Sequence, residues 1–445
     1  MILTPNAFTI MEKSSFFWFR RDLRLNDNTG LKHALRASKN VQVVFIFDET
    51  ILADLPKNDA RVTFIWQELE KINKELQEFG TSLLVLKGKP IEVWRKILTD
   101  QNLEAVFTNR DYEPKAIARD EEVRFLLESN GIQFNTFKDH VFFEKDEILK
   151  LDGTPYTIYT PYKNKWLEKY AKTNLEIPKP ELELNANYAK SDYSFPSLAD
   201  LGFVKSDIIA PAYKLAGVEN YDLHRDFPGK DHTTHLGHHL RFGAISIRSL
   251  VYYSARKNAT FLSEIIWRDF FSQIMGHFPD AMNEAFKKKY NHIPWRNNES
   301  EFKKWCDGET GYPIVDAGMR QLNQTGFMHN RVRMITASFL VKHLLIDWRW
   351  GEAYFAEKLL DFDLSANNGN WQWAAGTGCD AAPYFRVFNP SIQAEKFDKK
   401  QTYIRQWIPD YNSSTYLPPM VDHAMARDRA IKTYKQALDM FPVND

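Results

Sequence analysis

Short apolar runs alternate with longer amphipathic stretches in residues 14–140. A short apolar run is typical of a strand buried on both faces, and an amphipathic stretch with a 3.6-residue period is typical of a helix. The apolar runs are Phe16–Phe19, Val41–Phe47, Ser82–Leu86, Ala105–Phe107 and Ile132–Phe137, and the helical stretches include Ala60–Phe79 and Ala116–Asn130. The alternation predicts a doubly wound parallel α/β sheet of buried strands.

The pattern changes after this region. From Glu176 to Asp200 the chain is polar and interrupted by prolines, as expected of a long connection between domains. Helical periodicity dominates beyond it, at Phe261–Met275, Ile314–Leu322, Val332–Ile346, Glu352–Leu360 and Asp422–Met440. We therefore predict an α/β domain at residues 14–140, a linker at 141–205 and an all-α domain at 206–445, since the chain is too long for one typical core.

Composition places the protein in a broad class. The formal net charge is zero, which neither favours nor excludes a nucleic-acid partner. The only cysteines, Cys306 and Cys379, exclude a disulfide framework and are typical of a reducing compartment. Met1–Lys13 lacks the basic and apolar regions of a signal peptide, and no membrane-length apolar stretch occurs. We predict a soluble, cytoplasmic protein with no membrane partner, and Met11 as a second candidate start.

Motifs for phosphate or metal binding are weak. No G-x-G-x-x-G follows the first predicted strand, and G-x-x-x-x-G-K-[ST] is absent. The histidines His232, His235, His238 and His239, with Asp231 beside them, have a spacing compatible with metal ligands. No thiolate is near them and one carboxylate is too few for a typical site, so we predict no metal.

Two residue pairs on predicted helices mark a polar cleft. Glu264 and Trp267 are three residues apart and Asn330 and Met334 are four apart, so each pair shares one helix face. Taken alone, a Glu beside a Trp is more often a solvated face with a packed aromatic residue.

Aromatic residues are concentrated in the same domain. Trp371 and Trp373 are two apart, so a helix turns them roughly 200° from each other, and one can face inward while the other faces a cleft. On residue type alone, we expect the tryptophans to be core residues and Arg333 and Asp361 to form a structural ion pair. Composition and spacing thus indicate only an aromatic-rich helical domain with a polar cleft.

The segments GYPIVDAGMRQLNQTGFMHNRVRMITASFLVKHLLIDWRWGE (Gly311–Glu352) and DFDLSANNGNWQWAAGTGCDAAPYFRVFNP (Asp361–Pro390) closely resemble the flavin domain of the photolyase and cryptochrome family. FFWFRRDLRLNDNTGL (Phe16–Leu31) resembles the family's first strand and turn. The resemblance covers nearly the whole chain and is closest to class I photolyases of cyclobutane pyrimidine dimers (CPDs). It implies an α/β domain that often holds an antenna chromophore, and a helical domain that holds a U-shaped FAD.

The resemblance also implies the cofactor-binding residues. The family's phosphate loop T-S-R-L-S corresponds to Thr233, Thr234, His235, Leu236 and Gly237, with Tyr221 on the adenine side; Asp361, Phe362 and Asp363 lie beside the isoalloxazine, Arg333 pairs with the first aspartate, and Asn367 faces flavin N5. His235 replaces the usual Arg and Gly237 the final Ser, which alters two side-chain donors, although the backbone N–H groups can still cradle a pyrophosphate. An amide opposite N5 is the photolyase-like choice.

Electron-transfer residues follow from the same resemblance. Trp371, Trp348 and Trp295 correspond to the family's tryptophan chain, which leads from the flavin to the surface. A chain of neighbouring indoles divides a long electron transfer into short hops, so that light can reduce resting FAD.

The cleft residues resemble those of CPD photolyases. The five positions of the CPD pocket correspond to Glu264, Trp267, Asn330, Met334 and Trp373, and those that contact the DNA backbone correspond to Arg225, Arg331, Arg386 and Gln393. The 6-4 photolyases carry G-[WF]-I-H-H-L-x-R-H where this chain has Phe327–Met334, so 6-4 chemistry is disfavoured. We assign catalysis to Glu264, Trp267, Met334 and Asn367.

The expected function is light-driven repair of CPDs in UV-damaged DNA by electron transfer from excited FADH⁻, carried out by a monomer. The alternatives are a cryptochrome-type blue-light photoreceptor without repair activity and a relative that prefers single strands. The antenna stays open between folate, deazaflavin, a second flavin and none; Asn109–Pro114 lies where family members contact it.

Overall fold

The computed structural model describes residues 13–100, 102–173, 181–230, 232–412 and 414–440. They form two compact units. The first comprises the described residues of Met1–Glu144, Asn174–Pro211 and Leu236–Tyr253, and the second those of Lys145–Thr173, Ala212–His235 and Ser254–Asp445. Met11, Asp231 and part of the polar connection lie outside the described residues.

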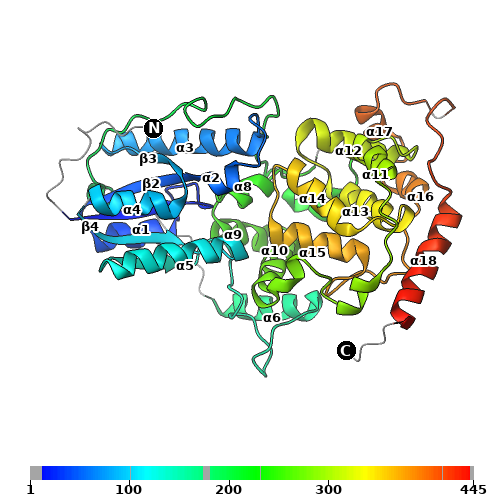
Figure 1. The fold of residues 1–445 in the computed structure, drawn as a ribbon, viewed down its shortest axis with the longest axis horizontal. Helices are drawn as coiled ribbons and strands as arrows, with labels where there is room; N and C mark the ends of the chain where they lie inside the picture. Colours follow the sequence, from blue (N-terminus) through cyan, green and yellow to red (C-terminus); the bar gives the residue numbers. More distant parts are fainter. Residues whose placement is uncertain (1–12, 101, 174–180, 231, 413, 441–445) are drawn as a thin grey trace. The chain divides into compact units, whose positions relative to one another are not determined.

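The first unit is built around a parallel five-stranded sheet (Figure 1). Its strands are β1 (Ser14–Phe19), β2 (Val41–Asp48), β3 (Leu84–Gly88), β4 (Leu103–Asn109) and β5 (Gln133–Phe137). The order β3-β2-β1-β4-β5 confirms the predicted doubly wound sheet, because the winding reverses between β1 and β4. Each predicted strand forms.

Helices cover both faces of this sheet because successive side chains of the central strands point to opposite faces. Phe17 and Phe19 pack on one face against α1 (Thr29–Ala37) and α3 (Ala60–Glu78). Phe16 and Trp18 pack on the other against α4 (Pro90–Asp100) and α5 (Pro114–Ser129). The short helix α2 (Glu49–Leu52) follows β2.

One strand differs from the prediction. We expected Ile132–Phe137 to be buried, but β5 is an edge strand with half-buried and exposed residues, because β4 is its only neighbour. An apolar run does not reveal whether a second strand or a helix covers it.

The predicted linker contains structure of its own. Helix α6 (Tyr159–Lys172) belongs to the second unit, and the 3₁₀ turn η1 (Leu182–Asn187) to the first, where Tyr188 bridges to Val41 of β2. Helix α8 (Gly237–Arg241) and most of α9 (Ile247–Lys257) also belong to the first unit. The domain limits at 140 and 205 stay predictions.

The second unit is helical, as predicted. Its further elements are η2 (Val218–Asn220), α7 (Tyr221–His224), α10 (Ala259–His277), η3 (Pro279–Met282), η4 (Lys288–His292), α11 (Glu299–Asp307), α12 (Pro313–Thr325), α13 (Asn330–Ser338), η5 (Phe339–His343), α14 (Trp348–Lys358), α15 (Leu364–Ala375), α16 (Pro390–Phe397), α17 (Thr402–Trp407) and α18 (His423–Met440). Its main core joins α11 to α15, and the predicted closing helix is α18, red in Figure 1.

The helix predicted at Val332–Ile346 is not continuous. The α-helical part ends at Ser338, and Phe339–His343 forms a π-helical turn. Leu345 has a φ of 52°, which ends the helix. Apolar periodicity continues through the turn, so the pattern alone cannot show the change. Among the described residues, no helix has both the length and the apolar character needed to cross a membrane.

Candidate functional site

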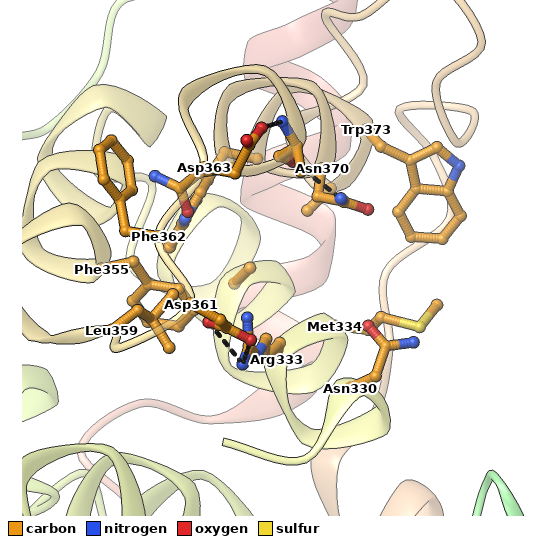
Figure 2. Close-up of a pocket in the computed structure, with 15 residues that line it drawn as sticks. Asn330, Arg333, Met334, Phe355, Leu359, Asp361, Phe362, Asp363, Asn370 and Trp373 are labelled. Carbon is orange, nitrogen blue, oxygen red and sulfur yellow. Dashed lines mark hydrogen bonds and ion pairs between the residues drawn. The ribbon is translucent and has the colours of Figure 1, made fainter. Parts of the chain in front are cut away.

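One cavity of the second unit gathers five of the eleven predicted cofactor-binding residues, those assigned to the isoalloxazine side. Its wall includes Asn330, Arg333, Met334, Phe355, Leu359, Asp361, Phe362, Asp363, Asn367, Asn370, Trp371 and Trp373. They come from α13, α14, the loop after α14 and α15. Asn330 and Met334 lie on the same side of the cavity as Trp373 (Figure 2), which agrees with the shared helix face expected for the first two.

A charged pair forms part of the wall, as predicted. Arg333 Nη2 lies 2.9 Å from Asp361 Oδ2 and 3.1 Å from Oδ1 (Figure 2). Arg333 Nε donates to the carbonyl oxygen of Met328 at 2.8 Å. The Met328 bond fixes the guanidinium plane, so that the guanidinium and the carboxylate form a rigid polar edge. Asp363 caps α15 by accepting from the backbone N–H of Ala366. A capping residue at the cavity edge thus sets where α15 begins.

Asn367 has a fixed side-chain orientation. Its Nδ2 donates to Glu352 Oε1 at 2.8 Å and to the Glu352 carbonyl oxygen at 3.0 Å. Since both N–H bonds are used on Glu352, the amide oxygen is the atom left to accept a hydrogen bond from a group in the cavity. Burial raises the pKa of Glu352. The family resemblance identified Asn367, and sequence reasoning missed Glu352, whose only signal is its place at the end of the matched segment.

Trp371 and Trp373 diverge as the two-residue spacing predicts. Trp371 is buried, with its ring centroid 5.0 Å from that of Phe355 and 6.1 Å from that of Trp305. Trp373 is half-buried and lines a second, apolar cleft together with Trp267 and Phe271. Trp373 therefore borders both spaces.

A parallel stack supports the wall of the second cleft. The rings of Trp267 and Tyr159 have centroids 3.5 Å apart and planes within 7°. The Tyr159 hydroxyl donates to the Ser263 carbonyl oxygen at 2.7 Å, which holds the ring in place. Tyr159 lies within the predicted linker, so sequence reasoning missed it.

Four charged residues of the second unit form a continuous chain. Arg225 pairs with Glu264, and Arg331 Nη2 lies 2.7 Å from Asp226 Oδ1. Arg225 Nε lies 3.8 Å from Asp226 and joins the two pairs. Burial raises the pKa of Glu264, although the neighbouring Arg225 acts in the opposite direction. One residue predicted to contact the dimer, Glu264, is thus paired with one predicted to contact the DNA backbone, Arg225.

Other predicted residues lie apart from the cavity wall. Tyr221 begins α7 and packs on Phe261, while Thr233 contacts His235 at 3.3 Å. His235 has a φ of 51°, and its ring lies 5.0 Å from Phe327. Thr234 accepts a backbone hydrogen bond from Lys214, and Leu236 and Gly237 belong to the first unit. Arg386 is exposed and Gln393 half-buried.

The remaining tryptophans predicted for electron transfer share the core of Trp371. Trp348 is buried in that core and Trp295 packs at its edge. Within the described part of the chain, no three His, Cys, Asp or Glu side chains are grouped to hold a metal ion; His238 and His239 both face the Pro211 carbonyl oxygen. Cys306 and Cys379 are free thiols.

Polar residues cluster in the first unit where β1 and β4 end. Asn109 donates to Asp22 Oδ2 at 2.6 Å and accepts from the Gly30 N–H at 2.8 Å. Arg21 pairs with Asp111 and Glu113. The predicted antenna segment therefore begins at the reversal point of the sheet, the usual ligand position in such folds.

Known proteins match this chain over nearly its whole length. A family model described as DNA photolyase matches residues 15–182, and one described as the FAD binding domain of DNA photolyase matches residues 261–415. A deoxyribodipyrimidine photo-lyase of Halobacterium salinarum is 36% identical over 95% of this chain and 98% of its own length. The chain belongs to the photolyase and cryptochrome family. Another photo-lyase, from Alkalihalophilus pseudofirmus, is 35% identical over 94% of this chain and 97% of its own.

Solved structures of the family agree with the fold. A class III photolyase from Agrobacterium tumefaciens has a TM-score of 0.84 and 31% identity, covering 98% of this chain and all of its own. An archaeal photolyase from Sulfolobus tokodaii, with two FAD molecules, has a TM-score of 0.80 and 35% identity over 95% of this chain and all of its own. A Synechocystis cryptochrome has a TM-score of 0.82 at 23% identity over 96% of this chain and all of its own, which supports the fold alone. The predicted family, the predicted fold and the prediction of a photo-lyase enzyme are confirmed.

The cavity of this family member fits a flavin. An isoalloxazine presents a polar edge of carbonyl and N–H groups and an apolar benzenoid end. The Arg333–Asp361 pair and the Asn367 oxygen offer both donors and acceptors to such an edge, and Phe355, Leu359 and Ala337 offer apolar contacts. The donor set and the apolar wall thus suit the cofactor that the family model names.

Proposed function

We propose that this photolyase repairs cyclobutane pyrimidine dimers in DNA under blue light, using reduced FAD. The observation that carries the proposal is the position of Trp373. This side chain lines both the cavity that suits a flavin and the aromatic cleft that contains Trp267. A cofactor in the first space and flipped bases in the second are separated by little more than one side chain. Electron transfer requires such proximity.

The cavity residues bind and orient the cofactor. The chemistry that bound FADH⁻ would supply is light-driven donation of one electron to the dimer, whose cyclobutane ring then opens before the electron returns to the flavin. Arg333 and Asp361 hold the polar edge of the ring, and the fixed Asn367 oxygen accepts a hydrogen bond from a protonated N5. An amide does not titrate near neutral pH, so it favours the reduced form without exchanging a proton.

The aromatic cleft receives the damaged bases. A dimer stacks and pairs poorly, so flipping it out of the helix costs less than flipping normal bases. Trp267, held by Tyr159, and Trp373 provide apolar walls for it, and Met334 lies with Trp373 on the wall of the adjoining flavin cavity. Glu264 lies one helical turn from Trp267 on α10 and hydrogen-bonds the carbonyl edge of the dimer.

Arginines bind the DNA backbone without reading sequence. Arg225 pairs with Glu264, Arg331 pairs with Asp226, and Arg386 is exposed on the loop before α16. In the free protein the first two are neutralised by Glu264 and Asp226, and phosphates compete for them when DNA binds. Gln393, on α16, adds a neutral contact.

Tryptophans of the buried core supply electrons to resting flavin. Trp371 borders the flavin cavity, Trp348 is buried in the same core and Trp295 lies at its edge. Each indole can donate an electron to the next, and a reductant in solution restores the electron that the outermost indole has lost. The protein acts as a monomer. Asn109–Pro114 is the segment where an antenna chromophore would bind, and the antenna stays open between folate, deazaflavin, a second flavin and none.

A repair assay tests the proposal. Purified, chemically reduced protein is illuminated with a CPD-containing oligonucleotide, in double- and single-stranded form, and restored thymines are measured. We expect repair by the wild type, and a strong loss in Glu264→Ala with FAD still bound. The matched control is Glu357→Ala, since Glu357 is an exposed α14 residue paired with Lys358. Absence of repair with fully reduced flavin would favour a photoreceptor of the cryptochrome type.

The absorption spectrum of the same holoprotein tests the antenna. FAD alone gives only flavin bands, whereas a folate, deazaflavin or second flavin adds its own absorption or doubles the flavin content. A spectrum and extracted cofactors equivalent to one FAD would refute an antenna in this protein.

A further inference from the structure

The two tryptophans of the second cleft come from two different helices. Trp267 lies on α10 and Trp373 on α15. Each has a second cleft residue one helical turn away on its own helix, Phe271 after Trp267 and Gly369 before Trp373. Residues four apart share one helix face, so each helix presents a tryptophan and its neighbour to the same space.

The Phe271 ring lies directly on the backbone of Gly369. A Cβ at this glycine would be 3.0 Å from Cγ of Phe271 and still closer to Cδ1 and Cε1 of the same ring. Carbon atoms pack at about 3.5 Å, so the ring reaches α15 only because position 369 has no side chain. Phe271 is buried, and its ring is therefore the spacer between α10 and α15 at this level.

Trp267 rests on this spacer. Its ring stacks on Phe271 with centroids 5.3 Å apart and planes at 28°. It also stacks on Tyr159, so it has little freedom to move independently of its neighbours. The distance from Trp267 to α15 therefore depends on the space that the Phe271 ring occupies.

Hydrogen bonds hold α15 to the chain segment that follows α10. Asn368 Nδ2 donates to the Met282 carbonyl oxygen at 3.2 Å, and Gln372 Nε2 donates to that of Ala281 at 2.8 Å. Gln372 Oε1 also accepts from the Phe286 N–H at 2.8 Å. These bonds oppose rotation of α15 about its axis, so the direction of its side chains toward the cleft is fixed.

We propose that the Phe271–Gly369 contact sets the width of the cleft between its two tryptophans, and that this width selects a covalently joined pyrimidine pair. This inference rests on the proposed function, in which the cleft receives the dimer. A cyclobutane ring joins two bases through two carbon–carbon bonds, so they lie closer together than stacked bases can and do not separate. A cleft of fixed width accepts such a compact pair, whereas two unlinked bases must also be held together. Phe271 and Gly369 act through the tryptophans and are positioning residues.

A methyl group added at Gly369 tests the spacer from one side. The new Cβ pushes Phe271, and Trp267 with it, away from α15 by roughly 1 Å. We expect Gly369→Ala to weaken binding of CPD-containing DNA about tenfold, the effect of a misplaced methylene in an apolar pocket. Binding of undamaged DNA stays at the wild-type level, because it depends on contacts with phosphates.

Removal of the Phe271 ring tests the spacer from the other side. Phe271→Leu leaves a gap beside Gly369 and should also weaken binding of CPD-containing DNA. In the double variant Gly369→Ala/Phe271→Leu the smaller side chain makes room for the new methyl group. We therefore expect the double variant to bind CPD-containing DNA several-fold more tightly than Gly369→Ala alone. General damage to the fold would instead make the two losses add.

Binding to flavin-loaded protein in the dark measures these effects. Affinities are determined for a duplex with one CPD and for the undamaged duplex of the same sequence, together with FAD content and melting temperature. The ratio of the two affinities should fall about tenfold in Gly369→Ala and recover in the double variant. Gly276→Ala on the same helix is the matched control and keeps the wild-type ratio, because a Cβ there meets only the flexible Lys145 side chain.

Three results would overturn the spacer: a wild-type ratio in Gly369→Ala, an equal fall of both affinities, or a double variant that binds CPD-containing DNA no better than Gly369→Ala. If Gly369→Ala does not fold or loses FAD, Phe271→Leu decides, and a wild-type ratio there refutes the inference. A wild type that does not prefer CPD-containing DNA contradicts the proposed function itself. That failure is visible before any variant is compared, so the two failures are distinguishable.

Discussion

Gly351 of α14 leaves no room for a side chain against Trp371. A Cβ at this position would lie 2.2 Å from Cη2 and 2.5 Å from Cζ3 of Trp371, and 2.6 Å from Cδ2 of Leu340. Carbon atoms in contact need about 3.5 Å, so Gly351→Ala must displace the indole by roughly 1 Å. Trp371 has little freedom to move, because Phe355 and Trp305 enclose it.

Two opposing effects decide the change in stability. Replacing a helical glycine by alanine stabilises a helix by about 0.5–1 kcal/mol. Overpacking of a well-packed core costs about 1–3 kcal/mol, and the upper part of that range applies because all three contacts are with buried atoms. We expect Gly351→Ala to lower the free energy of unfolding by about 1–2 kcal/mol and to reduce FAD content, since Trp371 lines the cavity.

Gly276 of α10 provides a matched control. A Cβ there would lie 3.1 Å from Cδ of Lys145, a flexible side chain that can move aside. We expect Gly276→Ala to keep or raise stability and to leave the ratio of FAD to protein unchanged. Thermal unfolding and the absorbance ratio of flavin to protein measure both effects. If Gly351→Ala melts at or above the wild-type temperature with full FAD content, the packing argument is wrong.

Three further predictions concern individual side chains of the second unit. Burial lowers the pKa of His329 to about 4 from 6.5. The neutral imidazole therefore contributes stability that is complete above pH 6.5 and is lost as the pH falls toward 4. His329→Asn keeps the cap of α13 and should weaken this pH dependence of the melting temperature. Glu352→Ala releases the Asn367 amide and should speed air reoxidation of reduced flavin. Tyr159→Leu removes the stack on Trp267 and should weaken binding of CPD-containing DNA several-fold, whereas Tyr159→Phe keeps it.

Each of these predictions has an outcome that contradicts it. An unchanged slope of melting temperature between pH 6.5 and 4 in His329→Asn would show that this histidine does not drive acid destabilisation. Equal reoxidation rates in Glu352→Ala and wild type would remove Glu352 as a positioning residue. Equal CPD affinity in Tyr159→Leu and Tyr159→Phe would mean that Trp267 needs no support.

The sequence predicts an element correctly where its hydrophobic pattern is compatible with only one structure. Apolar runs such as Val41–Phe47 lie in the middle of the sheet, and their pattern predicts both the strand and its burial. Ile132–Phe137 has a similar pattern but lies at the edge, because burial depends on a neighbour that the run does not encode. Likewise, the apolar stripe continues across Ser338 although the hydrogen bonding changes there.

The site was predictable by resemblance and much less so by chemistry. Residue type alone suggested Arg333 with Asp361 only as a structural ion pair, and the family motifs gave the pair a position beside the flavin. Neither approach indicated Glu352 or Tyr159. Both act through contacts with residues distant in sequence, which spacing within one helix does not reveal.

Within the proposed function, the pairing of Glu264 with Arg225 has a consequence for DNA binding. The half-buried Glu264 carboxylate has Arg225 as its paired cation, while Asp226 adds a like charge nearby. When a phosphate draws Arg225 away, Glu264 remains in a desolvated place without its counter-charge, and its protonated form becomes more favourable. A protonated carboxyl can donate a hydrogen bond to a pyrimidine carbonyl, which an ionised one cannot. In the proposed function, binding of phosphate by Arg225 therefore favours the protonated form of Glu264, the group proposed to hold the dimer.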